Sequence, residues 1–212
     1  MKEIILDTET TGLSVKDGHR IVEIGCIELD NLVPTKNIFH CYLNPERKVS
    51  EKAFEVHGYS DQFLSNKKKF FEIADDFLNF IKDKKIIIHN AEFDISHLNN
   101  ELSIAGKPEI NKEHTVDTLD LARNKFPGSG ISLDALCKRF RIDNSKREKH
   151  TALIDCELLA KVYINLLDQK EPKLNFSNSV DINSVENQKK NITYSKKIVY
   201  PTSEELEQHR EF

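Results

Sequence analysis

The pattern of apolar and polar positions changes along the chain, from β-type segments near its start to mainly helical segments after residue 50. Apolar, β-branched and aromatic residues dominate at 2–7, 20–29 and 37–43, and the short separations predict an antiparallel meander of three strands. Residues 86–89 (IIIH) form a short run without polar alternation, which is typical of a buried parallel strand. A fifth strand is predicted at 115–117.

Helical patterns fill most of the remaining chain up to residue 168. Ser50 and Ser132 are residue types that cap helix N-termini, and an apolar stripe at 69–81 repeats at helical spacing. In chain order, the predicted helices follow Ser50 and then cover 69–81, 92–105, the segment ending at Phe126, 132–140 and 151–167. This order of elements predicts an α/β domain in which a mixed five-stranded sheet is flanked by helices.

The composition of the chain changes after about Asp168. Residues 169–195 are rich in Asn, Ser, Lys and Gln and have little periodicity, which is typical of a flexible linker. Apolar and then helical content returns at 196–212, as in a short docking peptide. We therefore expect a folded domain at 1–168, a flexible linker at 169–195 and a C-terminal docking peptide at 196–212.

Composition and charge narrow the class of protein. Of the 212 residues, 38% are apolar and 31% are charged, and no stretch approaches the roughly 18 apolar residues that span a bilayer, so we expect a globular protein with no membrane partner. The N-terminus lacks a signal-peptide cleavage site and the four cysteines form no Cys-x-x-Cys pair, which favours reduced thiols and a cytoplasmic location. The net charge of −4 gives little support for nucleic-acid binding, although clustered carboxylates can bind a phosphate chain through cations.

Asp7 and Glu9 lie at the end of the first predicted strand. Side chains at i and i+2 of an extended chain point to the same side, so the two carboxylates converge while Thr8 points away. Two close carboxylates repel each other unless a cation joins them, and a hard ion such as Mg²⁺ takes oxygen ligands. Taken alone, the pair is also compatible with two solvated side chains at a strand end.

Three further polar residues are expected near the same edge of the sheet. Asp94 follows the apolar strand 86–89 in the first turn of a helix, where it could equally stabilise the helix end. Asp155 lies in the first turns of the last helix, whose apolar face would hold it against the strand ends. His150 lies on the loop before that helix, and a histidine in a loop rich in Lys and Arg is often simply solvated.

These residues occur within motifs that follow the order of a known family. The motifs are DTETTGL at 7–13, VHG at 56–58, HNAEFD at 89–94, SLDALC at 132–137 and HTALID at 150–155. Together they resemble the motifs of the DEDD exonucleases, in the branch that has a His five residues before the last Asp. Over roughly residues 3–168 the resemblance is closest to the epsilon, or proofreading, subunits of bacterial DNA polymerase III.

The resemblance implies a ribonuclease H-like fold and a metal-dependent 3′→5′ exonuclease that removes mispaired nucleotides from DNA 3′ ends. It implies that two divalent cations, Mg²⁺ or Mn²⁺, are held by Asp7, Glu9, Asp94 and Asp155. His150 would be the general base that activates water. The implied substrate-binding residues are Asp7, Glu9, Thr10, His57 and Asp155. Lys52 departs from the family pattern, which often has an acidic residue at this position.

The resemblance also implies partners. These are a single-stranded or frayed DNA 3′ end and the DNA polymerase III alpha subunit, bound through the tail segment IVYPTSEELEQH. Residues 169–176 (QKEPKLNF) resemble a sliding-clamp peptide, although the spacing is degenerate. Two other functions stay open: a free-standing exonuclease of the same branch that acts on RNA or small DNA fragments, and a non-catalytic scaffold module. The tail favours the polymerase-bound protein over the first, and the complete set of acidic and histidine residues favours an enzyme over the second.

Overall fold

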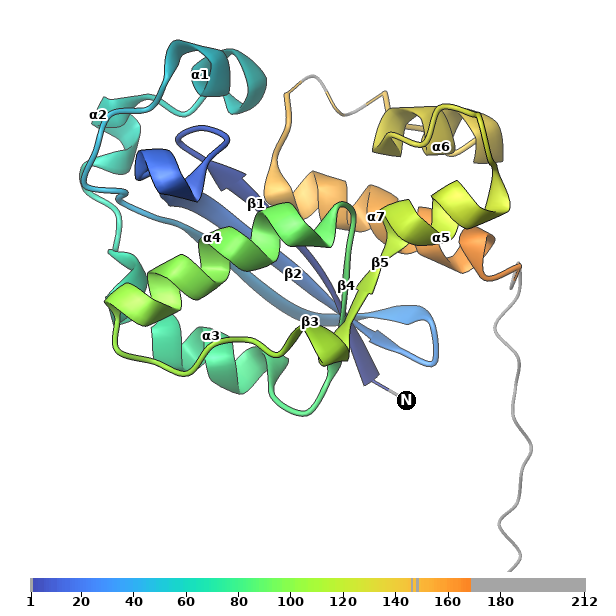
Figure 1. The fold of residues 1–212 in the computed structure, drawn as a ribbon, viewed down its shortest axis with the longest axis horizontal. Coiled ribbons are helices and arrows are strands. Elements are labelled where there is room, and N and C mark those ends of the chain that lie inside the picture. The colour runs from blue at the N-terminus through green and yellow to red at the C-terminus, as the bar shows by residue number, and fades with distance from the viewer. Residues whose placement is uncertain (1, 146, 148, 169–212) are drawn as a thin grey trace, which may run out of the picture. The chain divides into compact units, whose positions relative to one another are not determined.

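A mixed sheet of five strands forms the framework of the described chain (Figure 1). The structure is a computed structural model that describes residues 2–145, 147 and 149–168, all within one compact unit bounded by Met1–Lys173. The strands are β1 (Lys2–Thr10), β2 (Ile21–Asp30), β3 (Val33–Tyr42), β4 (Lys85–Ile88) and β5 (Thr115–Asp117). Their spatial order is β3-β2-β1-β4-β5.

The strand directions confirm the sheet that the sequence predicts. β2 pairs antiparallel with both β1 and β3, which makes the expected meander. β4 pairs parallel with β1, and β5 pairs parallel with β4. β1 continues past the end of β4. The pairing of the two strands stops at Ile5↔Ile87, while β1 extends to Thr10. The last part of β1 therefore has a free edge on the β4 side, and this edge borders the site described below.

Seven α-helices connect and cover the strands in the described chain. They are α1 (Glu51–His57), α2 (Asp61–Leu64), α3 (Ala74–Ile81), α4 (Ala91–Ile104), α5 (Thr118–Lys125), α6 (Leu133–Phe140) and α7 (Ala152–Leu166). Three 3-10 turns, η1 (Val15–Asp17), η2 (Phe70–Glu72) and η3 (Lys112–His114), complete the order. These three turns and α2 were not predicted, because each is too short to show a repeat of apolar positions.

One predicted helix is wrong in its extent. The expected helix at 69–81 divides into η2 and α3, with Ile73 between them. The Glu72 carboxylate accepts a hydrogen bond from the backbone N–H of Lys69 at 2.7 Å, which closes a separate 3-10 turn before the α-helix begins. Phe70 and Phe77 still point into the same core, so the predicted apolar stripe is confirmed, although the α-helix is shorter than predicted.

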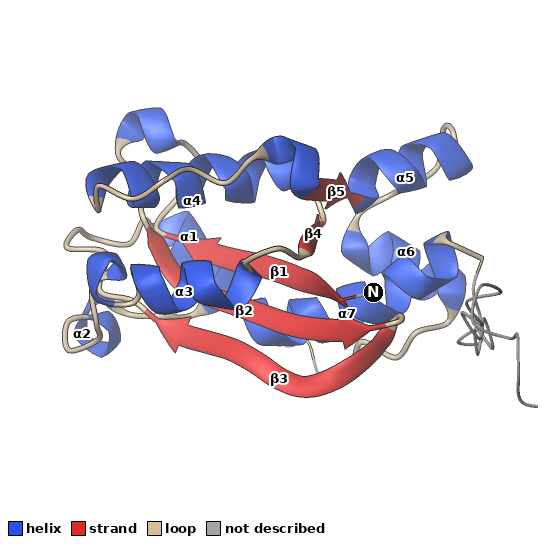
Figure 2. Ribbon diagram, turned by 90° about the horizontal axis from the view of Figure 1, so that it is seen from below, coloured by secondary structure: helices blue, strands red, loops and turns tan. Residues whose placement is uncertain are grey.

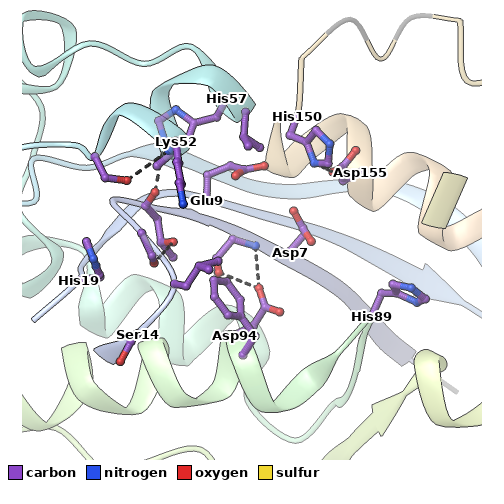
Figure 3. A pocket seen from close by; sticks show the side chains of 18 of the residues that line it. Asp7, Glu9, Ser14, His19, Lys52, His57, His89, Asp94, His150 and Asp155 are labelled. Carbon is purple, nitrogen blue, oxygen red and sulfur yellow. Dashed lines mark hydrogen bonds and ion pairs between the residues drawn. The ribbon is translucent and has the colours of Figure 1, made fainter. Parts of the chain in front are cut away.

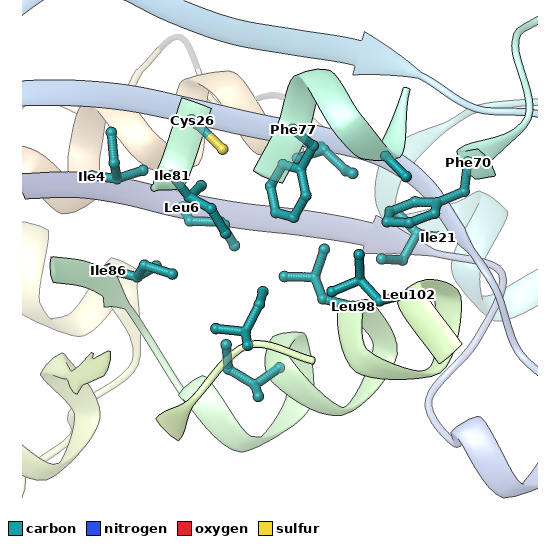
Figure 4. Close-up of a cluster of buried hydrophobic side chains, with 14 of the residues drawn as sticks. Ile4, Leu6, Ile21, Cys26, Phe70, Phe77, Ile81, Ile86, Leu98 and Leu102 are labelled. Carbon is teal, nitrogen blue, oxygen red and sulfur yellow. The ribbon is translucent and has the colours of Figure 1, made fainter. Parts of the chain in front are cut away.

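The two faces of the sheet are covered by different helices (Figure 2). Alternate residues of β1 point to opposite faces, so Ile4 and Leu6 pack with α3 and α4, whereas Ile5 packs with α5, α6 and α7. Figure 4 shows the first of these cores, in which Phe77 contributes a large, fully buried side chain. Because both faces of β1 are buried, the direction of its side chains at the end of the strand is fixed by the packing of the whole domain.

Helix α7 lies unusually close to β2, at Gly25. A Cβ atom at this glycine would come within 2.6 Å of the carbonyl carbon of Ala152, the first residue of α7. The Cys156 Sγ lies 3.2 Å from the Gly25 carbonyl oxygen, one turn further along the helix. The absence of a side chain at position 25 therefore lets the N-terminal end of α7 approach the sheet.

The remaining expectations from the sequence have mixed outcomes. All four cysteines are free thiols, with Cys26, Cys137 and Cys156 buried and Cys41 half-buried, as predicted. Within the described residues, the structure contains no helix that is both long and apolar enough to cross a membrane. The predicted linker at 169–195 and docking peptide at 196–212 lie outside the described residues.

Candidate active site

A cavity of about 700 Å³ opens at the end of β1, between the N-terminal ends of α4 and α7 (Figure 3). All seven site residues predicted from the sequence line it, namely Asp7, Glu9, Thr10, His57, Asp94, His150 and Asp155. The size lies within the range of ordinary ligand sites. The structure therefore brings together residues that come from the first strand, the last helix and three segments between them.

The end of β1 supplies Asp7 and Glu9. Asp7 is half-buried and Glu9 is buried, and Thr8 between them points the other way, as the alternation of a strand requires. Thr8 meets Asp94 there: its hydroxyl donates to Asp94 Oδ1 at 2.7 Å and its backbone N–H donates to the same oxygen at 3.0 Å. Because β4 has already ended, this N–H has no strand partner, and the first turn of α4 supplies the acceptor.

The start of α7 supplies Asp155. Thr151 caps the helix by accepting a hydrogen bond from the backbone N–H of Ile154, which places Asp155 in the first turn. The buried Glu23 carboxylate of β2 accepts another bond from the backbone N–H of Ala152 at 2.9 Å. As the sequence predicts, the face of α7 with Leu159 and Val162 packs on the sheet. Asp155 itself is buried at the cavity wall.

Three of the predicted side chains come close enough to share one ion. Suitable ligand atoms of Glu9, His150 and Asp155 all lie within 4.8 Å of one another. Asp7 and Asp94 border the same space, although the group of three does not include them. The sequence predicted His150 as a general base, and this geometry also makes it a possible ligand.

The carboxylates in the cavity repel one another, and this changes their pKa values. Burial, and then the repulsion from Asp94, Glu9 and Asp155, raises the pKa of Asp7 well above its usual value. Burial, and then the repulsion from Asp155, raises the pKa of Glu9 to about 8. Burial also raises the pKa of Asp94 to about 7, against the hydrogen bonds from Thr8. Desolvated carboxylates that repel one another, with oxygen as their ligand atom, fit a divalent cation such as Mg²⁺ or Mn²⁺.

Asp155 differs from the other three carboxylates, because it already has cationic and hydrogen-bonding partners. Burial alone would raise the pKa of Asp155, but the neighbouring His150 and Arg147 side chains outweigh burial and hold that pKa below its usual value. Arg147 contacts Asp155 through two nitrogens, at 2.5 and 2.7 Å. Arg147 was not selected from the sequence, because it lies in a stretch of Lys and Arg that resembles a solvated loop.

His150 and His57 are held differently. The His150 side chain is 45% exposed, and its Nδ1 lies 2.9 Å from Arg147 Nη2 and 3.5 Å from Asp155 Oδ2. His57 is buried, and its Nδ1 accepts the Tyr59 backbone N–H at 3.0 Å while its Nε2 lies 3.3 Å from the Thr10 carbonyl oxygen. Both nitrogens of His57 therefore have partners within the protein, and its contact with substrate stays a prediction.

Thr10 lines the cavity, and the buried Glu23 supports the start of α7 beside it. The Thr10 hydroxyl donates to the Gly12 carbonyl oxygen at 2.7 Å, so its substrate contact also stays a prediction. Glu23 was missed in the sequence, although a charged residue inside the apolar strand RIVEIGCIEL was a visible signal. Besides capping α7, Glu23 accepts bonds from the Tyr59 hydroxyl at 2.8 Å and pairs with His40 at 2.7 Å. It therefore joins the α7 start to β3 and to the loop after α1.

Comparison with known proteins gives consistent matches. The family model RNase_T, described as an exonuclease, matches residues 4–163. The chain is 51% identical over 218 residues to DNA polymerase III subunit epsilon of Rickettsia conorii, covering 100% of this chain and 95% of that protein. It is 47% identical over 171 residues to the subunit epsilon of Escherichia coli, covering 77% of this chain and 70% of that protein.

Solved structures show the same fold. Exonuclease X in complex with 5′ overhanging duplex DNA matches with a TM-score of 0.61 and 26% identity, over 79% of this chain and 92% of that one. The nuclease domain of 3′hExo, a DEDDh family member bound to rAMP, matches with a TM-score of 0.69 and 17% identity, over 80% and 92% of the two chains. At this identity the second match supports the fold alone.

Proposed function

The chain belongs to the exonuclease family, among the DNA polymerase III epsilon subunits, and from this we propose that it removes mispaired nucleotides from DNA 3′ ends as a 3′→5′ proofreading exonuclease. One observation supports the proposal most strongly. Asp7, Glu9, Asp94 and Asp155 converge at the free end of β1, in a cavity that also contains His150. Burial, and then repulsion from the neighbouring carboxylates, raises the pKa of Asp7 and of Glu9, and bound cations would offset both effects.

In this proposal the four carboxylates hold two divalent cations, Mg²⁺ or Mn²⁺. The cations, when bound, would supply positive charge to the attacking and leaving oxygens of a phosphodiester. The protein supplies the placement: β1 fixes Asp7 and Glu9, the Thr8 bonds fix Asp94, and Glu23 fixes the start of α7 with Asp155. Such fixed placement lowers the reorganisation needed when charge develops on the phosphate.

His150 is proposed to take the proton from the attacking water. Its ring is half-exposed at the mouth of the cavity, and histidine is the side chain that most often acts as a general base in enzymes. The product would be a nucleoside 5′-monophosphate from the 3′ end. Thr10 and His57, which also line the cavity, are proposed to contact the terminal nucleotide, together with the metal-binding Asp7, Glu9 and Asp155.

The polymerase association is proposed through the C-terminal tail. The alignment with the Rickettsia conorii protein covers the whole chain, so its sequence similarity includes residues 169–212. We propose that 196–212 bind the polymerase alpha subunit and that 169–195 tether the nuclease to it, in the cytoplasm. Tethering raises the local concentration of the nuclease, so a modest peptide contact suffices. Sliding-clamp binding by 169–176 is a secondary proposal.

The function can be tested with labelled DNA. With Mg²⁺, the full-length chain is expected to shorten a 5′-labelled single strand one nucleotide at a time and to excise a mispaired 3′ terminus faster than a paired one, because the site needs an unpaired end. Asp7→Ala should lose this activity, whereas Asp76→Ala, an exposed carboxylate outside the site, should retain it. Equal rates on paired and mispaired ends, or faster degradation of RNA than DNA, would contradict the proofreading role.

The tail requires a separate experiment. The full chain and a variant that ends at residue 195 are mixed with the replicative polymerase alpha subunit and analysed by gel filtration. The full chain is expected to co-elute and the shortened chain to elute alone, while both degrade single-stranded DNA equally. Co-elution of the shortened chain would place the polymerase contact elsewhere.

A further inference from the structure

Arg147 occupies the part of the site that a cation would use. It lies between α6 and α7, and its side chain is only 7% exposed. The guanidinium holds Asp155 through Nε–Oδ1 at 2.5 Å and Nη2–Oδ2 at 2.7 Å. Nη2 also lies 2.9 Å from His150 Nδ1, and because arginine can only donate, His150 accepts there. Two of the three side chains that could share one ion are therefore already bound to Arg147.

A guanidinium and a divalent ion compete at such a place. The forked pair with Asp155 engages both carboxylate oxygens, which is a strong and geometrically specific contact. An ion on the same carboxylate would lie within a few ångströms of the guanidinium charge, in a cavity where water screens poorly. The ion must therefore displace Arg147 from at least part of this contact.

Asp134 offers Arg147 a second partner outside the cavity. Arg147 Nη1 lies 2.8 Å from Asp134 Oδ2, and the Asp134 side chain is 57% exposed. Asp134 belongs to the first turn of α6 and does not line the cavity. Arg147 can therefore leave Asp155 without losing every ionic contact, because one nitrogen already has its partner on α6.

We propose that Arg147 is an internal cation that competes with the divalent metal for Asp155, and that Asp134 receives it when the metal binds. This inference rests on the proposed function, because it assumes that the acidic cavity binds metal. Arg147 is thus a positioning residue. In the metal-free protein it compensates the Asp155 charge and holds the α6–α7 loop against α7, and it releases Asp155 when the metal binds.

The test measures Mn²⁺ binding to the full-length chain by titration calorimetry, without DNA. Arg147→Gln is expected to bind Mn²⁺ more tightly, by between about 5-fold and 150-fold, the usual range of coupling between two binding events. Arg147→Lys keeps the charge but loses the fork, so its affinity should lie between those of the wild type and Arg147→Gln. Arg141→Gln removes an exposed positive charge from the same loop and should change the affinity little.

Asp134 gives a prediction of opposite sign. Asp134→Asn is expected to weaken Mn²⁺ binding, because Arg147 then depends on Asp155 alone. In the Arg147→Gln background the same substitution should have no further effect, so the double variant separates a role through Arg147 from the loss of a nearby negative charge. A further readout is the melting temperature, which in EDTA should fall for Arg147→Gln and in saturating Mn²⁺ should match the wild type.

The outcomes separate this inference from the proposed function. Weaker or unchanged Mn²⁺ binding by both Arg147→Gln and Arg147→Lys would overturn the competition while leaving the nuclease proposal intact. A wild-type chain that binds no Mn²⁺ would overturn both. An Asp134→Asn effect that persists in the double variant would overturn the role of Asp134 as the receiving partner.

Discussion

The end of β1 and the loop between α6 and α7 border the same cavity, but they are held there by different means. β1 is hydrogen-bonded to β2 along its length and is buried on both faces, so Asp7 and Glu9 have positions that the sheet sets. The loop is held by a few contacts: the His150 backbone N–H donates to the Val56 carbonyl oxygen at 3.2 Å, and Arg147 binds Asp155 and Asp134. The fold thus fixes the negative charges, whereas side-chain contacts place the groups that must respond to cation and substrate.

The strongest test of this difference removes a carboxylate that the sheet fixes. Asp7→Ala is expected to lower exonuclease turnover by more than the roughly 100-fold that loss of an outer partner of a metal ligand costs. Because Asp7 is repelled by Asp94, Glu9 and Asp155, the metal-free variant should melt at the same temperature as the wild type or higher. Turnover of labelled DNA and thermal unfolding in EDTA are measured together.

Asp155→Ala sharpens the same test on α7. It should abolish turnover as well, but it removes the partner of Arg147, so its metal-free melting temperature should fall. Near-normal turnover in either variant would show that the carboxylates do not hold the catalytic ions.

The loop is tested through His150. His150→Gln is expected to lower kcat by about 10² to 10⁴-fold, the usual contribution of a general base, while Mn²⁺ affinity measured by calorimetry stays near the wild-type value. His114→Gln, an exposed histidine in η3, is the matched control. If Mn²⁺ affinity falls together with kcat, His150 is a metal ligand, as its distance to Glu9 and Asp155 also permits.

Gly25 tests how far the sheet controls the position of the start of α7. Gly25→Ala would place a Cβ 2.6 Å from the α7 backbone, and overpacking of this kind costs about 1–3 kcal/mol of unfolding free energy. Turnover should fall as well, because the added Cβ would push the start of α7, and Asp155 with it, away from β1. Gly130→Ala meets its nearest atom at 3.4 Å and should change stability by less than about 0.5 kcal/mol. Equal denaturation midpoints for the two variants would contradict this account.

The last test uses the pH dependence of the metal-free protein. Folding raises the pKa of Glu9 from 4.5 to about 8, so the folded state keeps a proton that the unfolded state loses. Stability should therefore be greatest below pH 4.5 as far as Glu9 is concerned, and should fall as pH rises through about 8. Glu9→Gln should flatten this slope in melting curves recorded in EDTA. A wild-type melting temperature that rises across this range, with no change of slope in the variant, would refute the assignment.

Local pattern predicted the sheet, whereas the four carboxylates were selected as one site through the motifs that resemble the DEDD exonucleases. Asp7 and Glu9 follow from strand alternation, and Asp94 follows a parallel strand whose end must lie beside theirs. Arg147 could not be found in this way, because its buried position depends on Asp155 and Asp134 meeting around it. The role of Glu23 could not be found for the same reason, because its bond to the Ala152 N–H joins residues far apart in sequence. The split of the expected helix at 69–81 depends on one local bond at Lys69, which periodicity does not reveal.

The carboxylates proposed to bind metal come from the first strand, from α4 and from the last helix of the folded domain, and this has a consequence for synthesis. While the ribosome is still making the protein, a nascent chain that already has β1, β2 and β3 has no Asp155, and α7 cannot pack on β1 and β2 until its own residues have emerged. Incomplete translation products therefore lack a finished hydrolytic centre. The order of the elements keeps a DNA-degrading activity silent until the whole domain has been produced.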